Sequence, residues 1–147
     1  MKGCAIMIYT EMTKKAMKLA YEMHEGQKDR SGIPYIFHPI HLAEQMVDED
    51  STIVALLHDI VEDTSMTFDK LLDLGFTSEI VDAIQLLTKP EEEDYLDYVS
   101  RVKQNELARK VKHLTHNMDL TRLDQPSQKD YERKNKYLKA LELLINK

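Results

Sequence analysis

Residues 55–64 read ALLHDIVEDT, and they are the strongest guide to this protein's structure. Within an apolar run they place four groups able to bind a metal or move a proton: His58, Asp59, Glu62 and Asp63. If the run is helical, residues four apart such as His58 and Glu62 stack along one surface of the helix. Buried charged groups are costly unless a cation compensates them. The stretch therefore predicts an apolar helix that carries a divalent metal site.

The rest of the chain has the composition of a helical protein. Only four of the 147 residues are glycine and four are proline, and helix formers dominate between them. We expect helices over about 11–25, from Pro39 to Val47, from a cap at Ser51 through the HDIVED run, from Thr67 to Gly75, from Thr77 or Ser78 to Leu87, from Glu91 to Val102, over 106–123 after a cap at Asn105, and onward from a cap at Ser127. The sequence therefore predicts an all-α, single-domain bundle of about seven to eight helices over residues 1–147, with residues 1–10 as a poorly defined N-terminal extension.

Composition and charge narrow the class of protein. A hydrophobic share of 42% and a charged share of 31% are typical of a soluble globular domain. The net charge of -6 argues against a general nucleic-acid binder, although a local basic pocket for a phosphorylated small molecule stays open. No apolar run is long enough to cross a bilayer, and the N-terminus lacks the pattern of a targeting segment. With a single cysteine, Cys4, these features predict a cytoplasmic protein.

Histidines elsewhere in the chain could join the motif. His38 precedes a predicted helix in PYIFHP, and a polar cluster at 113–117 lies within a later one. Imidazole and carboxylate together suit Mn, Fe or Zn better than Ca or Mg, which favour oxygen ligands. Single histidines are weak indications of metal binding, so the remaining ones are expected at the surface or hydrogen-bonded in the core: His24, His41 and His116.

These residues resemble a known family. His38-Pro39, HDxxED at 58–63 and a downstream polar helix with Asn117 are similar to the HD metal-dependent phosphohydrolases. Longer segments resemble the RelA/SpoT-type alarmone hydrolases, in particular the small stand-alone class related to the metazoan SpoT homologue: GQKDRSGIPYIFHP at 26–39, ALLHDIVEDT at 55–64, DYVSRVKQN at 97–105 and NMDLTRL at 117–123. The resemblance covers roughly residues 12–145 and implies an HD-type helical bundle.

The resemblance implies roles for the motif residues. In that family the corresponding residues bind one Mn, which would make His38, His58 and Asp59 the metal ligands. The following pair, Glu62 and Asp63, would act as acid/base or water-orienting groups. This arrangement fits hydrolysis of a phosphate ester. The metal would polarise a phosphoryl oxygen, and the carboxylate beside it would accept and donate protons.

The resemblance also implies which residues bind the nucleotide substrate. Lys28 and Arg30 resemble a basic loop that packs on the purine and contacts phosphate, and Arg133 and Tyr137 match a pattern that reaches the nucleotide. Arg133 and Tyr137 are four apart on a predicted helix and can face one ligand. Asn117 matches an asparagine that lines the site. The alternatives are surface charges for the basic residues, a core position for the tyrosine, and capping or core hydrogen bonding for the asparagine.

One position departs from the family pattern. Relatives carry an aspartate four residues before the asparagine as a fourth metal ligand, and here His113 stands at that position. The segment is also two residues shorter if it is counted from Val111, and two residues turn a helix by about 200°. Three outcomes stay open: His113 is a ligand, Asp119 supplies the ligand from the next turn, or three ligands and water hold the metal.

The sequence leads to one main hypothesis and two alternatives. The main one is a Mn-dependent 3′-pyrophosphohydrolase that converts guanosine tetra- or pentaphosphate to GDP or GTP and pyrophosphate, with Fe or Zn as other metals. The first alternative is another HD nucleotide phosphohydrolase, for example an NADPH 2′-phosphatase. The second is a catalytically weak nucleotide-binding regulatory module, because the fourth ligand is altered. The expected partner is a phosphorylated guanine nucleotide, not nucleic acid or membrane, and the oligomeric state is left open.

Overall fold

The computed structural model describes residues 6–121 and 128–145, except for the side chains of residues 116–121 and 128–131. These residues form helices and connecting loops, without a β-strand in the ranges described. The helices are α1 (Glu11–Met23), α2 (Phe37–Glu44), α3 (Glu49–Leu57), α4 (Ile60–Asp63), α5 (Phe68–Asp73), α6 (Ser78–Leu87), α7 (Tyr95–Val102), α8 (Glu106–Thr121) and α9 (Gln128–Ile145). The predicted all-α class is confirmed.

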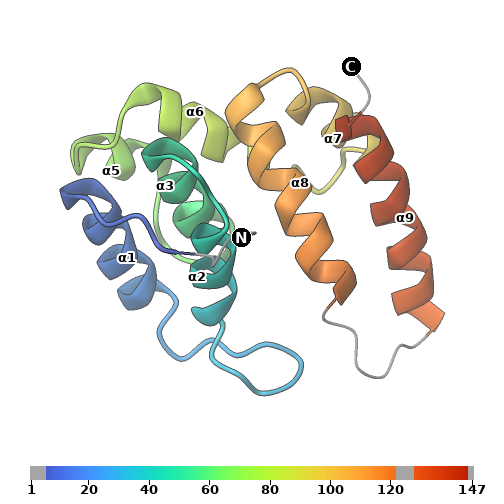
Figure 1. Cartoon of the computed structure of the whole chain (residues 1–147), viewed down its shortest axis with the longest axis horizontal. Helices are drawn as coiled ribbons and strands as arrows, with labels where there is room; N and C mark the ends of the chain where they lie inside the picture. Colours follow the sequence, from blue (N-terminus) through green and yellow to red (C-terminus); the bar gives the residue numbers. More distant parts are fainter. Residues whose placement is uncertain (1–5, 122–127, 146–147) are drawn as a thin grey trace.

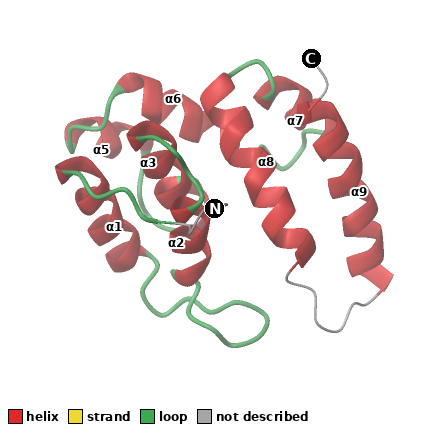
Figure 2. Cartoon of the chain, in the orientation of Figure 1, coloured by secondary structure: helices red, strands yellow, loops and turns green. Residues whose placement is uncertain are grey.

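Helix α3 lies at the centre of the molecule (Figure 1). Every residue from Ser51 to Leu57 is buried, which is expected of a helix surrounded on all sides. It packs against α1, α2, α6 and α8, and α8 in turn packs against α9. Figure 2 shows the same arrangement, with α7, α8 and α9 on one side of the molecule and α1 to α6 on the other. Contacts of α8 with α2, α3 and α6, and of α7 with α6, join these two groups of helices.

Side-chain caps begin several helices, and those of α6 and α8 lie at predicted residues, whereas the predicted cap Ser127 lies outside the described residues. The Thr67, Thr77 and Asn105 side chains accept hydrogen bonds from the backbone amides of the first turns of α5, α6 and α8. The start of α3 differs from the prediction, because Asp48 and not Ser51 is the cap. Its carboxylate accepts from the Ser51 amide at 2.8 Å. The helix therefore begins three residues earlier than its first serine suggests.

The predicted helix through the HDIVED run is interrupted at His58 and Asp59. Helix α3 ends at Leu57, and Asp59, with φ -105° and ψ 2°, leaves the helical conformation before α4 begins at Ile60. The His58 imidazole donates from Nδ1 to the Ala55 carbonyl at 2.7 Å, and such a side-chain bond competes with the helical hydrogen-bond pattern. The structure therefore has two helices where the sequence predicted one.

No helix in the described part of the chain is both long and apolar enough to span a bilayer.

Candidate metal centre

Three predicted ligands meet at one point. His38 comes from the first turn of α2, whereas His58 and Asp59 come from the interruption between α3 and α4. One ligand atom from each residue lies within 4.8 Å of the other two, and the two imidazole rings are 5.7 Å apart between centroids. The three side chains are buried or half-buried. Two imidazoles and a carboxylate at this spacing form a donor set suited to a transition metal or zinc.

The hydrogen bonding of His58 favours a cation between His58 and Asp59. A carbonyl oxygen only accepts, so the bond to Ala55 places the imidazole proton on Nδ1. The other nitrogen, Nε2, then carries a lone pair, and it is buried without a hydrogen bond of good geometry. It nevertheless lies 3.0 Å from Asp59 Oδ2, which is also an acceptor. Two acceptors facing each other at this distance need a proton or a metal ion between them, so the residues fit the expected cation.

Asp59 is held as a carboxylate by its surroundings. Burial would raise its pKa, but the adjacent His58 and a hydrogen bond from the Tyr35 hydroxyl outweigh burial and hold the pKa of Asp59 well below its usual range. Burial likewise opposes the charged form of His58, yet the Asp59 carboxylate wins and raises the pKa of His58. The Asp59 carboxyl, a predicted ligand, is thus ionised over the physiological pH range.

The two following acids differ in position. Glu62 lines the same cavity as the three ligands, whereas Asp63 is not among its lining residues. Burial and the negative charges of Asp59 and Asp63 raise the pKa of Glu62, and burial and Asp59 raise the pKa of Asp63. The backbone carbonyl of Asp63 accepts a hydrogen bond from Gln27 at 3.0 Å. Of the pair, Glu62 is therefore the carboxylate that faces the cavity.

The cavity next to the ligands has a volume of about 350 Å³. Its lining residues come from α2 and the loop before it, the α3–α4 junction, α4, the end of α6 and the loop after it, α7 and α8. The lining residues are Tyr35, His38, His58, Asp59, Glu62, Leu87, Lys89, Tyr95, Tyr98, Lys112 and Thr115. It is large enough for a phosphorylated fragment of a small molecule.

Helix α8 faces this cavity with residues that the sequence did not indicate. Lys112 and Thr115 line it, whereas His113 is half-buried and belongs neither to the lining nor to the ligand group. Counting forward from the buried Val111 would have found Thr115 one turn later. Counting back from Asn117 leads to His113 instead. The role of His113 as a fourth ligand stays a prediction, and the side chains of Asn117 and Asp119 lie outside the described residues.

The predicted basic loop lies between α1 and α2. Lys28 and Arg30 are exposed on it, and neither lines the cavity. The loop has internal order: the Asp29 carboxylate accepts from the Ser31 and Ile33 amides, at 2.8 and 3.1 Å. Figure 1 shows the loop (light blue) extending beyond the ends of both helices. The two basic side chains are thus carried on an ordered, projecting segment.

The two predicted substrate-binding residues on α9, Arg133 and Tyr137, lie in different surroundings. Tyr137 is half-buried, and its ring centroid lies 6.0 Å from that of Tyr95, a residue of the cavity wall. Arg133 is exposed and does not line the cavity.

Two of the isolated histidines lie where the sequence predicted. His24 is buried with Nδ1 2.9 Å from Gln27 Oε1, and His41 is exposed.

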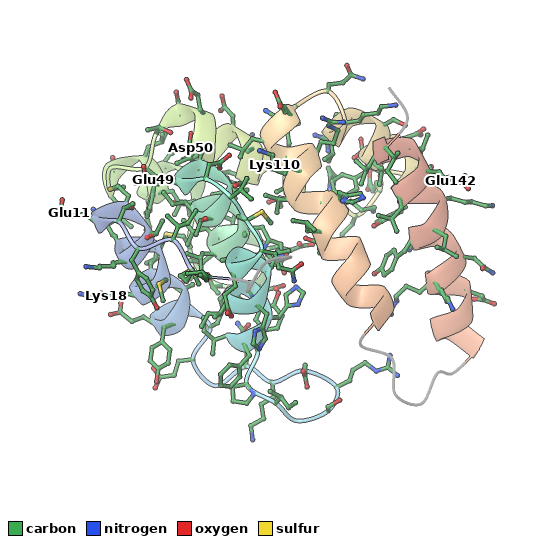
Figure 3. The ribbon with its side chains drawn as sticks, in the orientation of Figure 1. Glu11, Lys18, Glu49, Asp50, Lys110 and Glu142 are labelled. Atoms are coloured by element: carbon green, nitrogen blue, oxygen red, sulfur yellow. The ribbon has the colours of Figure 1, made fainter. Side chains whose placement is uncertain are left out.

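A larger cavity of about 690 Å³ lies elsewhere, between the beginning of α3 and the first turns of α8. Figure 3 shows Glu49, Asp50 and Lys110 at this end of the molecule. Six carboxylates line it, against one lysine: Asp48, Glu49, Asp50, Glu79, Asp82 and Glu106. Burial, and then the charges of Asp48 and Glu49, raise the pKa of Asp50. A phosphate would be repelled here, so the smaller cavity is the candidate site.

Known proteins match part of the chain. A chloroplastic RSH1 protein of Arabidopsis thaliana, named for a GTP diphosphokinase, is 48% identical over 66 residues, which are 42% of this chain and 8% of that protein. A guanosine-3′,5′-bis(diphosphate) 3′-pyrophosphohydrolase of Borreliella burgdorferi is 40% identical over 79 residues, 51% of this chain and 12% of that protein. The matched segments thus span only a small part of these much longer relatives.

A solved structure and a family model cover more of the chain. The structure is of a metazoan ortholog of SpoT described as hydrolysing ppGpp. It aligns with a TM-score of 0.74 and 21% identity over 95% of this chain and 88% of that one, which shows a shared fold. The HD domain model matches residues 16–141, a range that contains all three predicted ligands and both following acids. The chain therefore belongs to the HD domain family, and within it resembles the RelA/SpoT-type hydrolases.

Proposed function

We propose that this protein is a metal-dependent 3′-pyrophosphohydrolase acting on guanosine tetra- or pentaphosphate. The observation that supports this most directly is the convergence of His38, His58 and Asp59 beside a cavity, in a chain similar to relatives named for that activity. The reaction consumes one water. Its oxygen ends on phosphorus in the released pyrophosphate, a proton passes to the ribose 3′ oxygen, and GDP or GTP remains.

The donor set would hold one divalent cation, with Mn as the proposed metal and Fe or Zn as the other candidates. When bound, such a cation lowers the pKa of a coordinated water and polarises a phosphoryl oxygen. Asp59, kept ionised by His58 and Tyr35, supplies the negative ligand. Glu62 faces the cavity and would accept or return the proton as water attacks and the ribose oxygen leaves.

The substrate would extend from the metal toward the loop and α9. Lys28 and Arg30 on the projecting loop would contact purine and phosphate, and Tyr137, next to Tyr95 of the cavity wall, would border the nucleotide. Arg133 and Asn117 are proposed for the same end of the site. A cytoplasmic location, consistent with the single cysteine, belongs to this proposal as well.

A second candidate is a nucleotide-binding module with weak catalysis. It is favoured by the ligand group, which has three members among the residues with described side chains and does not include His113. A metal held by fewer protein ligands would bind less tightly and would leave a smaller fraction of the protein loaded. In that case the protein would bind the alarmone without turning it over.

One experiment separates these functions. The purified protein is stripped of metal, reloaded with Mn, and incubated with guanosine tetraphosphate, GTP and NADPH while released pyrophosphate and phosphate are measured. We expect pyrophosphate from guanosine tetraphosphate alone, and none from the Asp59→Asn variant. Phosphate from NADPH would favour the 2′-phosphatase instead. Tight alarmone binding without product would favour the regulatory module.

A further inference from the structure

The Gln27 side chain makes hydrogen bonds to two separate parts of the chain. Its Nε2 donates to the Asp63 backbone carbonyl at 3.0 Å, and its Oε1 lies 2.9 Å from His24 Nδ1. A carbonyl oxygen only accepts, so the bond to Asp63 determines which end of the amide faces each partner. Oε1 therefore accepts from His24, whose Nδ1 carries the proton. One amide group thus joins the end of α1 to the end of α4.

The histidine that orients this amide has a fixed position. His24 is the C-terminal cap residue of α1 and is only 2% exposed, and its ring centroid lies 4.9 Å from that of Tyr35. Its Nε2 is buried without a hydrogen bond to the described residues. The bond from Nδ1 to Gln27 is thus the side-chain hydrogen bond that the structure shows for this ring.

Helix α4 needs support from outside itself. It has four residues, Ile60–Asp63, and Asp59 before it makes no side-chain cap. A single helical turn is unstable by itself, and the last carbonyls of a helix have no partner within it. The Gln27 amide satisfies the carbonyl of the last residue, while the fully buried Ile60 anchors the first. The hydrogen bond from Gln27 therefore restrains the turn at its free end.

Glu62 lies on the turn that this hydrogen bond restrains. It comes directly before Asp63, and its side chain lines the candidate cavity. A group that moves a proton in catalysis must lie within hydrogen-bond reach of that proton. A displacement of about 1 Å can lower the rate about a hundredfold. Holding the Asp63 carbonyl thus helps to determine where the Glu62 carboxylate lies.

The backbone of Gln27 makes a different contact. Its carbonyl accepts from the Tyr35 amide at 2.8 Å and so closes the base of the loop that carries Lys28 and Arg30. Substitution of the Gln27 side chain leaves this backbone hydrogen bond in place. The effect of such a substitution on the site is therefore expected at α4 and not at the loop.

We propose that Gln27, oriented by His24, is a positioning residue that holds α4 so that the Glu62 carboxylate keeps its place at the cavity. This inference rests on the proposed function and adds to it the means by which the acid/base group is held. Gln27 acts through the Asp63 carbonyl and has no contact with metal or substrate in this mechanism.

The test compares the wild type with Gln27→Met, which keeps the length of the side chain but removes its amide group. Gln85→Met, the same change at an exposed position on α6, is the control. Steady-state pyrophosphate release, Mn content, thermal unfolding and amide hydrogen exchange are measured on the Mn-loaded proteins. We expect Gln27→Met to lower kcat between about tenfold and a hundredfold, with KM and Mn content unchanged. Exchange should become faster in α4 but not in α3, and Gln85→Met should match the wild type.

Two further comparisons separate positioning from a general loss of structure. In the Glu62→Gln background, Gln27→Met should leave the residual kcat nearly unchanged, because the group that it positions is already missing. A general folding defect would instead lower kcat by the same factor in both backgrounds. His24→Asn, whose amide can donate to Gln27 from near the place of Nδ1, should keep more of the kcat than His24→Leu.

Several outcomes would overturn the inference. These are an unchanged kcat in Gln27→Met, an equal loss in the Glu62→Gln background, loss of Mn, and an equal effect of Gln85→Met. If the wild type releases no pyrophosphate, the proposed function fails and hydrogen exchange decides: faster exchange confined to α4 in Gln27→Met supports the inference, and unchanged exchange overturns it. If the wild type is active and Gln27→Met alters neither kcat nor α4 exchange, the proposed function stands and the inference fails.

Discussion

The Tyr35 hydroxyl donates a hydrogen bond to Asp59 Oδ2, the same oxygen that lies 3.0 Å from His58 Nε2. The tyrosine comes from the loop before α2 and the aspartate from the junction after α3, so the bond joins two parts of the chain that each carry or adjoin a predicted ligand. Groups that bond to metal ligands orient them and tune their basicity. Tyr35 therefore prepares the carboxylate for a cation.

Replacing Tyr35 with phenylalanine should weaken metal binding while leaving the ring in place. We expect a loss of about tenfold in Mn affinity, the lower end of the range for groups that orient ligands. Titration calorimetry of the metal-free protein with Mn measures this directly. Tyr21→Phe, at an exposed position on α1, is the control and should bind Mn normally. Equal affinity in wild type and Tyr35→Phe would contradict the proposed role of the hydroxyl.

A carboxylate added at Thr115 should strengthen metal binding, because this position lines the cavity with the three ligands. We expect Thr115→Asp to raise Mn affinity about tenfold, comparable to other changes around metal ligands. His113→Asp, two residues away on α8, should have little effect. The same calorimetric titration compares them. A gain in His113→Asp without one in Thr115→Asp would instead support His113 as the fourth position.

Glu62→Gln tests the proposed proton transfer. The amide keeps the size of the side chain but cannot accept a proton, so kcat for pyrophosphate release should fall about a hundredfold or more. Mn content should not change, since Glu62 lies outside the ligand group. Steady-state kinetics and elemental analysis measure the two quantities. Glu142→Gln, exposed on α9, should leave kcat unaltered, and an active Glu62→Gln enzyme would remove Glu62 from the mechanism.

Asp48→Ala should lower the free energy of unfolding by about 1 kcal/mol at pH 7, because it removes the cap of α3. The exposed ion pair with Lys110 should add little. The Ser51 hydrogen bonds outweigh burial and lower the pKa of Asp48 below its ordinary value of 3.8. Its stabilisation is therefore fully present above that value and is lost as the pH falls through the lower folded-state pKa.

Urea unfolding at pH 7 and near pH 2 measures this pH dependence. The difference between wild type and Asp48→Ala should be smaller in acid than at neutrality. Asp48→Asn, which keeps a capping side chain, should be closer to the wild type at pH 7. A constant difference between wild type and Asp48→Ala at both pH values would contradict the pKa argument.

The sequence predicted the local features of this fold well, because local chemistry determines them. Thr77 and Asn105 cap helices as expected, since a cap needs only a side-chain oxygen and the amides that follow it. The convergence of His38 on His58 and Asp59 is different, because it depends on how α2 packs against α3. That part of the prediction came from resemblance to a family.

Two features of the site could not be predicted from the helical periodicity of the sequence: the interruption at His58 and the face that α8 turns toward the cavity. The interruption at His58 arises from a bond between the imidazole and the Ala55 carbonyl, which periodicity does not reveal. The face of α8 was assigned by counting from Asn117, whereas in the structure Lys112 lines the cavity together with Thr115, which lies one turn after the buried Val111. The substrate roles of Lys28, Arg30, Asn117 and Arg133 stay predictions, as does the single domain.

The interruption between α3 and α4 also limits how this motif can be reused in protein engineering. In an unbroken helix adjacent side chains point about 100° apart, so His58 and Asp59 would aim at different places. Here Asp59 leaves the helical conformation, and the two side chains bring their ligand atoms to within 3.0 Å. A graft of HDIVED onto a straight designed helix would therefore separate the two side chains. A graft intended to bind metal must include the interruption of the helix at Asp59 as well as the sequence of the motif.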